Sequence, residues 1–192
     1  MSEVKNILLC GVGGQGAILT SKILTEGLVR AGYDVKMSEV HGMAQRGGSV
    51  STQVRYGDKV HSPLFGKAQA DVCLAFERME AVRYAEYMKP CGVFIVNDYR
   101  LTPMSVAVGA ASYPDDAIGA VSAAFETVTV PAADIAAGLG NVRVMNVVLL
   151  GALVKSLGLG DLPGVKWEDV VASQVPAKLR DINLEAFRAG LA

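Results

Sequence analysis

The sequence is poor in charged residues and has no excess of either sign. Charged residues make up 19% of the 192-residue chain, and 18 lysines and arginines nearly balance 19 aspartates and glutamates. Proteins that bind nucleic acid carry a positive surplus for the phosphate backbone, so this balance argues against a nucleic-acid partner. A charged fraction below the usual value of about 25% indicates that another protein covers part of the surface.

Cysteines are few, and they lack the spacing of metal sites. The three cysteines are Cys10, Cys73 and Cys91, and no two of them form a Cys-x-x-Cys pair. The chain therefore has no cluster or zinc pattern of its own, and we expect it to bind no metal or cofactor alone. Cys10 and Cys73 stand in apolar runs and are predicted to be small core residues.

Long hydrophobic runs are also absent. The most apolar stretch, residues 144–154, contains Asn146 and is followed by Lys155, whereas a membrane span needs about 20 apolar residues. We interpret this stretch as a buried core helix. Glu3 and Lys5 flank the first short apolar run, which does not resemble a signal peptide. We expect a cytoplasmic protein with no membrane partner.

The chain does contain a regular alternation of short apolar runs and helical patterns. Strands are predicted over residues 6–10, 34–40, 49–56, 70–76, 92–96, 105–108 and 127–130. Helices are predicted from Gly16 to Gly32, over 78–88, over 116–125, after Pro131, over 143–157 and twice near the end. Residues 59–61 are expected to return as a hairpin strand after the Gly57-Asp58 turn.

This order predicts the fold class. A strand, a glycine loop, a helix and a second strand over residues 6–40 are typical of a right-handed crossover unit in a parallel sheet. We predict one Rossmann-like α/β domain over residues 1–192, with a mainly parallel sheet, helices on both faces and a β-hairpin.

The first candidate site is the glycine loop over residues 11–16, which fits the G-x-G-x-x-G pattern between a strand and a helix. Amides at the start of the following helix can bind an anion, and Glu39 falls where a ribose-binding carboxylate would stand. Alternatively, the glycines only permit a tight turn and close packing of the helix on the strand. The candidate residues are Gly11, Gly13, Gly14, Gln15, Gly16 and Glu39.

The second candidate site is a glycine-rich segment that follows the second predicted strand. Arg46 carries a planar fork of donors suited to phosphate or carboxylate. Ligands of open α/β sheets bind at the carboxyl ends of the strands, so we predict that both loops meet at that edge. The alternative is an ordinary surface loop with a solvated arginine. The candidate residues here are His41, Gly42, Gln45, Arg46, Gly47 and Gly48.

Three further polar residues stand beside predicted core elements. Glu77 ends an inner strand and is expected either to line the cleft or to cap the following helix. Asn97 follows another inner strand, and we expect it in a turn. Asn146 lies within an apolar helix, so its amide needs a partner, which we expect to be a nearby loop backbone.

The two loop motifs together resemble a known family. Residues 11–16 followed by Gly42-x-x-x-Arg46-Gly-Gly48 are similar to the gamma domain of the 2-oxoacid:ferredoxin oxidoreductases. The sequence of residues 38–48 is most similar to that of the indolepyruvate branch. The pyruvate branch usually has a proline at position 43 and an acidic residue at position 44, where this chain has Met43 and Ala44. Residues 141–152 and 183–190 resemble later parts of the same domain.

The resemblance implies a small subunit that is inactive alone. The family oxidises a 2-oxoacid, here an arylpyruvate, with coenzyme A as co-substrate and ferredoxin as electron acceptor. Thiamine diphosphate, magnesium and iron–sulfur clusters are expected in a large (alpha) partner subunit, which the two loops would face. Two alternatives remain open at this point: a stand-alone dinucleotide-binding Rossmann protein and a non-enzymatic assembly partner.

Overall fold

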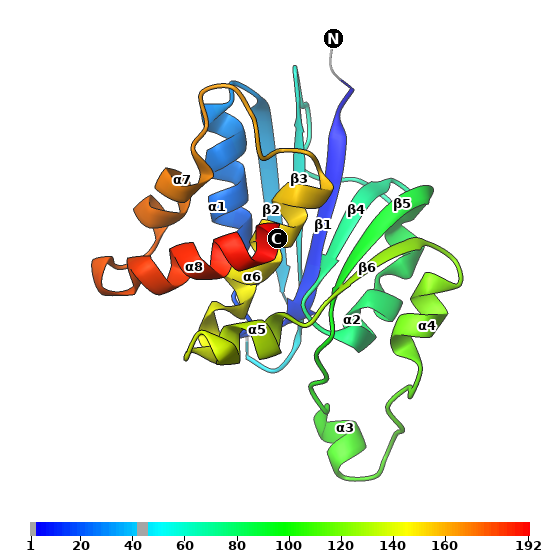
Figure 1. The fold of residues 1–192 in the computed structure, drawn as a ribbon. Helices are drawn as coiled ribbons and strands as arrows, with labels where there is room; N and C mark the ends of the chain where they lie inside the picture. Colours follow the sequence, from blue (N-terminus) through cyan, green and yellow to red (C-terminus); the bar gives the residue numbers. More distant parts are fainter. Residues whose placement is uncertain (1–2, 42–45) are drawn as a thin grey trace.

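The computed structural model of the protein describes residues 3–41 and 46–192. Within them the chain forms a six-stranded sheet of order β2-β3-β1-β4-β5-β6 (Figure 1). Strands β1, β4, β5 and β6 are mutually parallel, and β3 is antiparallel to both of its neighbours. The strands are β1 Lys5–Val12, β2 Asp34–His41, β3 Ser49–Gly57, β4 Ala70–Ala75, β5 Met88–Asn97 and β6 Glu126–Val130.

Helices cover both faces of the sheet, which confirms the predicted fold class. One face carries α1, α5, α6, α7 and α8, and the other carries α2 and α4. The α-helices are α1 Ala17–Arg30, α2 Arg78–Arg83, α3 Met104–Ala107, α4 Ala117–Ser122, α5 Ala132–Gly138, α6 Met145–Ser156, α7 Trp167–Gln174 and α8 Arg180–Leu191. Short 3-10 turns are η1 Ala85–Tyr87, η2 Val142–Val144 and η3 Ala177–Leu179.

The helix predicted in the most apolar stretch is confirmed as α6. Its residues from Asn146 to Val154 are all buried, because α6 lies between the sheet and the helices α5 and α8. Within the described part of the chain, no helix has the length and apolar character needed to cross a bilayer.

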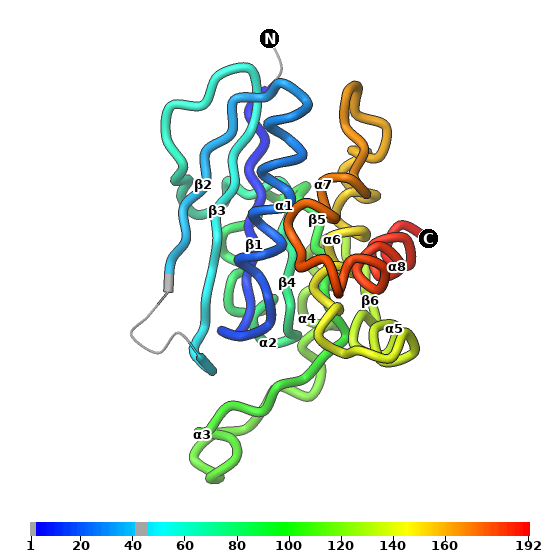
Figure 2. Tube along the Cα trace, turned by 90° about the vertical axis from the view of Figure 1, so that its left-hand side faces the viewer, coloured from blue at the N-terminus to red at the C-terminus, as the bar shows by residue number. Residues whose placement is uncertain are grey.

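Strand β3 gives the first correction to the predicted topology. Strands β1 and β2 run in the same direction, as a crossover unit requires, but β3 lies between them and pairs with both (Figure 2). The hairpin is therefore formed by β2 and β3. Residues 59–61 form no returning strand, because the Val60 amide donates to the Asp34 carboxylate at 2.8 Å and so is not available for a ladder.

Three other local predictions differ from the structure. Residues 105–108 lie in and beside the short helix α3, on an arm that projects beyond the carboxyl edge of the sheet (Figure 1). The helix predicted over residues 78–88 ends at Arg83 and is followed by η1. Strand β3, predicted to be half-buried, is buried on both faces over residues 51–54, because Gln53 accepts a hydrogen bond from the Phe65 amide of the loop that covers it.

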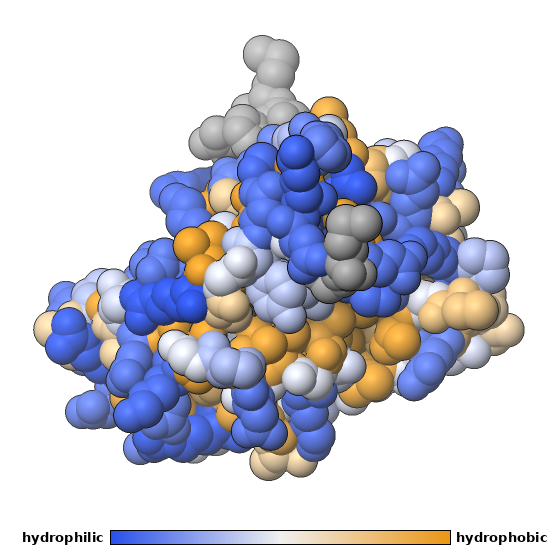
Figure 3. All heavy atoms as spheres, turned by 90° about the horizontal axis from the view of Figure 1, so that it is seen from above, coloured by the Kyte–Doolittle hydropathy of each residue, from blue (hydrophilic) through white to orange (hydrophobic). Residues whose placement is uncertain are grey.

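Figure 3 views the edge at which the parallel strands begin. Hydrophilic residues cover most of the margin of this face, and hydrophobic residues gather toward its middle. The glycine loop lies at the opposite edge, where β1 ends.

The cysteines of the two inner strands are core residues, as predicted. Cys10 on β1 and Cys73 on β4 are fully buried, with 3.6 Å between their sulfur atoms, whereas Cys91 is exposed. Burial raises the pKa of the Cys10 thiol well above its ordinary value, and the adjacent Cys73 thiol adds to the rise. The thiolate is the reactive form, so the Cys10 thiol is protected both sterically and chemically.

This arrangement predicts the reactivity of the thiols. Native protein treated with a chromogenic disulfide reagent is expected to show one fast-reacting thiol, from Cys91, with Cys10 and Cys73 reacting only after unfolding. Replacing Cys91 with serine should remove the fast phase and leave the two thiols that react only after unfolding. A fast phase that survives in this variant would contradict the buried placement of the other two.

Candidate functional site

The two predicted loops lie side by side at the edge where β1 ends. The Gly13 amide donates to the Gly48 carbonyl at 2.9 Å, and the Gly47 amide donates to the Gly13 carbonyl at 3.1 Å. The predicted meeting of the loops is thus confirmed for their described residues. Its cause is the antiparallel pairing of β1 with β3, because the chain enters β3 beside the point where it leaves β1.

Gln15 shapes the glycine loop from within. Its Oε1 accepts from the Val12 amide at 2.7 Å, and its Nε2 donates to the Phe76 carbonyl at 3.2 Å. The side chain is only 8% exposed. The Gln15 amide, a candidate for contact with a ligand or partner, therefore ties the loop to the end of β4. Sequence reasoning missed this internal role, which depends on a contact 61 residues away along the chain.

The glycines of the loop are required for different structural reasons, which are close packing, a positive φ, or both. A Cβ on Gly11 would lie 2.8 Å from the Cβ of Phe76, so close packing requires the glycine. Gly16 has a φ of +87° and faces the side chain of Asn146, with no room for a Cβ. Gly14 has a φ of +107° and open space around its Cβ position. A ligand or partner can therefore approach the backbone most closely at Gly14.

Helix α1 begins directly after this loop, with an N-terminus open to anions. Gly16 is its N-cap, no side chain caps it, and its first turn contains no carboxylate. The Asn146 Nδ2 lies 3.5 Å from the Gly16 carbonyl, at the limit of a hydrogen bond, as expected for a polar residue in α6 that needs a loop partner. The partial positive charge of the helix end adds to the attraction of an anion.

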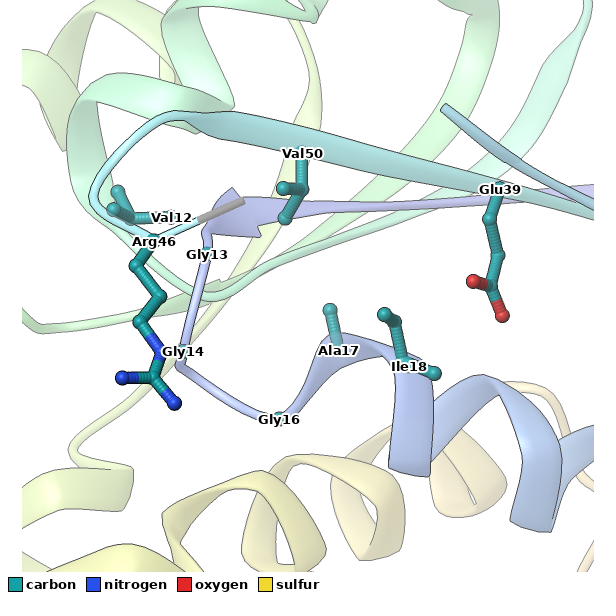
Figure 4. Close-up of a pocket in the computed structure, with 9 residues that line it drawn as sticks. All are labelled: Val12, Gly13, Gly14, Gly16, Ala17, Ile18, Glu39, Arg46 and Val50. Carbon is teal, nitrogen blue, oxygen red and sulfur yellow. The ribbon is translucent and has the colours of Figure 1, made fainter. Parts of the chain in front are cut away.

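A cavity of about 380 Å³ joins the two loops. Figure 4 shows Arg46 extending past Gly14 at one end of the cavity and Glu39 projecting from β2 at the other. Ala17, Ile18 and Val50 form apolar walls between them. The arrangement offers a cation and helix amides at one end for a phosphate or carboxylate, and an apolar surface beside them.

Glu39 does not stand where a dinucleotide fingerprint requires its carboxylate. In that fingerprint the acidic residue ends the strand adjacent to the first one. Here β3 separates β2 from β1, and Glu39 pairs in register with Thr52 of β3. The exposed Glu39 lines the cavity but is one strand further from the glycine loop than the fingerprint implies.

The remaining predicted site residues fall outside this geometry or have structural roles. Gly42 and Gln45, and the side chain of His41, lie outside the described residues. Glu77 caps α2 by accepting from the Met79 amide at 2.7 Å, the capping role among the two expected for it. The same carboxylate accepts from the Leu101 amide and the Tyr113 hydroxyl, which fixes the base of the arm that carries α3.

Tyr113 was not recognised from sequence as part of this edge, whereas Asn97 was placed at the edge but was expected in a turn. Burial raises the pKa of the Tyr113 phenol, and its hydrogen bond to the Glu77 carboxylate raises it further. Asn97, expected in a turn, is fully buried and links the Phe76 carbonyl to the Ala132 amide at 3.1 and 3.2 Å. Both residues join segments distant along the chain, which no local pattern reveals.

The described residues do not provide a set of metal ligands. Among residues 3–41 and 46–192, no group of three His, Cys, Asp or Glu side chains converges on a point. Cys10 and Cys73 face the core, and Cys91 lies exposed on β5. An iron–sulfur cluster needs several thiolates directed at one position, and the described cysteines do not fit one.

Comparison with known proteins gives consistent matches over nearly the whole chain. The family model described as pyruvate ferredoxin/flavodoxin oxidoreductase matches residues 6–192. Indolepyruvate oxidoreductase subunit IorB of Archaeoglobus fulgidus is 40% identical over 190 residues, covering 96% of this chain and 92% of the relative. The same subunit of Thermococcus kodakarensis is 38% identical over 195 residues, covering 97% and 94%.

A solved structure gives the same relationship. The gamma subunit of a keto/oxoacid ferredoxin oxidoreductase from Geobacter sulfurreducens superimposes with a TM-score of 0.71 at 26% sequence identity. The superposition covers 97% of this chain and 95% of the other. The similarity therefore extends to the whole domain, including the helices that follow the sheet.

Proposed function

Because the chain belongs to the pyruvate ferredoxin/flavodoxin oxidoreductase family, we propose that it is the small subunit of an indolepyruvate oxidoreductase. The observation that carries the proposal is the 40% identity to an IorB subunit over nearly the full length of both chains. It agrees with the resemblance inferred from the two loop motifs, and the subunit is an oxidoreductase component of the 2-oxoacid:ferredoxin type.

The proposed reaction converts an arylpyruvate, coenzyme A and oxidised ferredoxin into an arylacetyl-CoA, carbon dioxide and reduced ferredoxin. The two electrons released by oxidative decarboxylation pass to ferredoxin. Thiamine diphosphate with magnesium and the iron–sulfur clusters are assigned to the large partner subunit, where thiamine diphosphate supplies the electron sink for decarboxylation. No three thiol, imidazole or carboxylate side chains converge within the described residues, which supports that division.

The two loops are proposed to face the large subunit and to form part of the entrance for coenzyme A or substrate. Arg46 lies at the mouth of the cavity with an exposed guanidinium, suited to a phosphate or carboxylate. The open backbone at Gly14 and the uncapped start of α1 support an anion at the same place. The hydrogen bonds between Gly13 and Gly47–Gly48 hold these parts together.

Surface composition also supports a protein partner. Met104 and Val108, on the arm that carries α3, are 76% and 68% exposed, and the arm projects at the same edge as the loops. Clustered apolar side chains on a surface are typical of protein interaction sites. The cysteines of the described residues are unpaired, which fits a reducing compartment, and the proposal includes the cytoplasm.

The two alternatives have less support. A stand-alone dinucleotide-binding protein would need a carboxylate on the strand next to β1, and Glu39 is not on that strand. The IorB relatives favour the oxidoreductase subunit over both.

Co-expression with the large subunit tests the proposal. The purified complex is expected to reduce ferredoxin with indolepyruvate, phenylpyruvate or hydroxyphenylpyruvate in a reaction that depends on coenzyme A and thiamine diphosphate. The small subunit alone should be inactive with the same substrates. Failure of the two chains to co-purify, or micromolar binding of NAD(H), NADP(H) or FAD by the isolated chain, would contradict the proposal.

A further inference from the structure

A second, larger groove adjoins the glycine loop. It has a volume of about 810 Å³ and extends from the loop at Gly14–Gly16 to η2 and η3. Three cationic side chains line it: Arg46, Arg143 and Lys178. They come from three separate parts of the chain that only the fold brings together.

The groove has no matching negative charge of its own. Among the described residues, no aspartate or glutamate lines it, and no carboxylate lies within ion-pair distance of Arg46, Arg143 or Lys178. All three side chains are exposed. The chain has a formal net charge of -1, so this local concentration of cations does not follow from a general basic excess.

Asparagine side chains fix the backbone along the groove. Asn141 Oδ1 accepts from the Arg143 amide at 3.1 Å at the start of η2. Asn183 Nδ2 donates to the Leu179 carbonyl at 2.7 Å at the end of η3. These contacts are made by the asparagine side chains and the backbone, which leaves the long cationic side chains of Arg143 and Lys178 free to meet another molecule.

We propose that this groove binds an acidic segment of the large subunit, an inference that rests on the proposed function. Apolar residues alternate with the cations along it, and one of them, Val142, is 48% exposed. Apolar contact combined with arginine is typical of protein interfaces. Arg46, Arg143 and Lys178 come from separate elements, so they can pair with several carboxylates along one acidic segment. The electrostatic field of the three cations also attracts an acidic partner as it approaches.

The groove also continues the surface assigned to the partner. Arg46 and Gly14 line both this groove and the cavity of Figure 4. A partner that covers the cavity is therefore in position to enter the groove. Arg143 and Lys178 line the groove alone, so changing them tests docking without changing the residues proposed for the cavity.

The test is the affinity of the large subunit for the R143E/K178E variant of this chain. Charge reversal is expected to weaken the complex by about 10- to 100-fold, because it replaces attraction with repulsion at an interface. Added sodium chloride should weaken the wild-type complex more than the variant complex. A K22E/K59E variant, with the same charge change at exposed lysines outside the groove, should bind within about twofold of wild type.

The other outcomes are distinct. Equal affinities for the groove variant and the control variant would overturn the docking proposal. Normal assembly with a raised KM for coenzyme A would also overturn it, by assigning the groove to a phosphate-bearing small molecule. If the wild-type chain itself fails to bind the large subunit, the proposed function fails and the docking proposal with it. Thermal unfolding of each isolated variant confirms that folding is unchanged.

Discussion

In the assembled enzyme, replacing Arg46 with alanine is expected to lower kcat/KM for coenzyme A by about 10- to 100-fold. A hydrogen bond from a charged donor contributes about 1.5–3 kcal/mol, and about 1.4 kcal/mol corresponds to a factor of ten. The Arg46 side chain is exposed, and within the described residues it forms no ion pair or hydrogen bond. Its removal should therefore leave folding intact, and the complex is expected to assemble because Arg143 and Lys178 remain in the groove.

Steady-state kinetics with varied coenzyme A and saturating arylpyruvate measure this effect. An Arg46→Lys variant keeps the charge but loses the planar fork, so it should recover only part of the activity. Assembly of each variant is checked by co-purification with the large subunit. Kinetics indistinguishable from wild type in Arg46→Ala would remove this residue from the entrance that we propose.

The largest effect on stability is expected at the crossing of α6 and α8. A Cβ on Gly190 would lie 2.0 Å from the carbonyl oxygen of Val148, and a Cβ on Gly151 would lie 2.3 Å from that of Phe187. Both obstacles are backbone atoms, so a rotamer change cannot relieve the clash. The helices must move apart, and α6 is buried in the core. Gly190→Ala is expected to lower the free energy of unfolding by about 3 kcal/mol.

Urea unfolding followed by fluorescence measures this cost. Trp167 is the single tryptophan and is 4% exposed, so its emission reports loss of the packed core around α7 and α8. Gly138→Ala is the matched control, because this glycine ends α5 with no atom within 4 Å of its Cβ position. There alanine should be neutral or stabilising by up to about 1 kcal/mol. A Gly190→Ala midpoint equal to that of wild type would show that the helices are not held so closely.

Local patterns were sufficient for many elements of the fold. The apolar runs that became β1, β4 and the second half of β5 lie in the interior of the sheet, where most of their side chains are buried. The predicted second strand matches β2, and Pro131 precedes α5 as expected for a helix start. These features depend on residues near one another in the chain, and such features are visible without the fold.

The position of β3 was not predictable in the same way. Its insertion between β1 and β2 depends on backbone pairing with strands that begin 44 and 15 residues earlier. An alternating pattern such as that of β3 is typical of an antiparallel strand, but it does not specify which strands become its neighbours. Residues 105–108, on the arm that carries α3, were predicted as a strand. Their apolar pattern is too short to distinguish a strand from a helix, and their exposure was not known from the sequence.

The candidate site likewise has features that the local sequence predicts and features that depend on contacts between distant segments. The amino-acid sequence alone determined the two glycine-bearing loops, their similarity to one family and the absence of cysteine spacing that binds a cluster. Each of these features depends only on the identity of residues that are close in the chain. Only the tertiary structure decided that Gln15 is used internally, that Glu39 is one strand away, and that Arg143 and Lys178 join Arg46 around one groove. The physical reason is that hydrogen bonds and charges act between atoms close in space, and chain order does not encode which distant segments the packed core brings together.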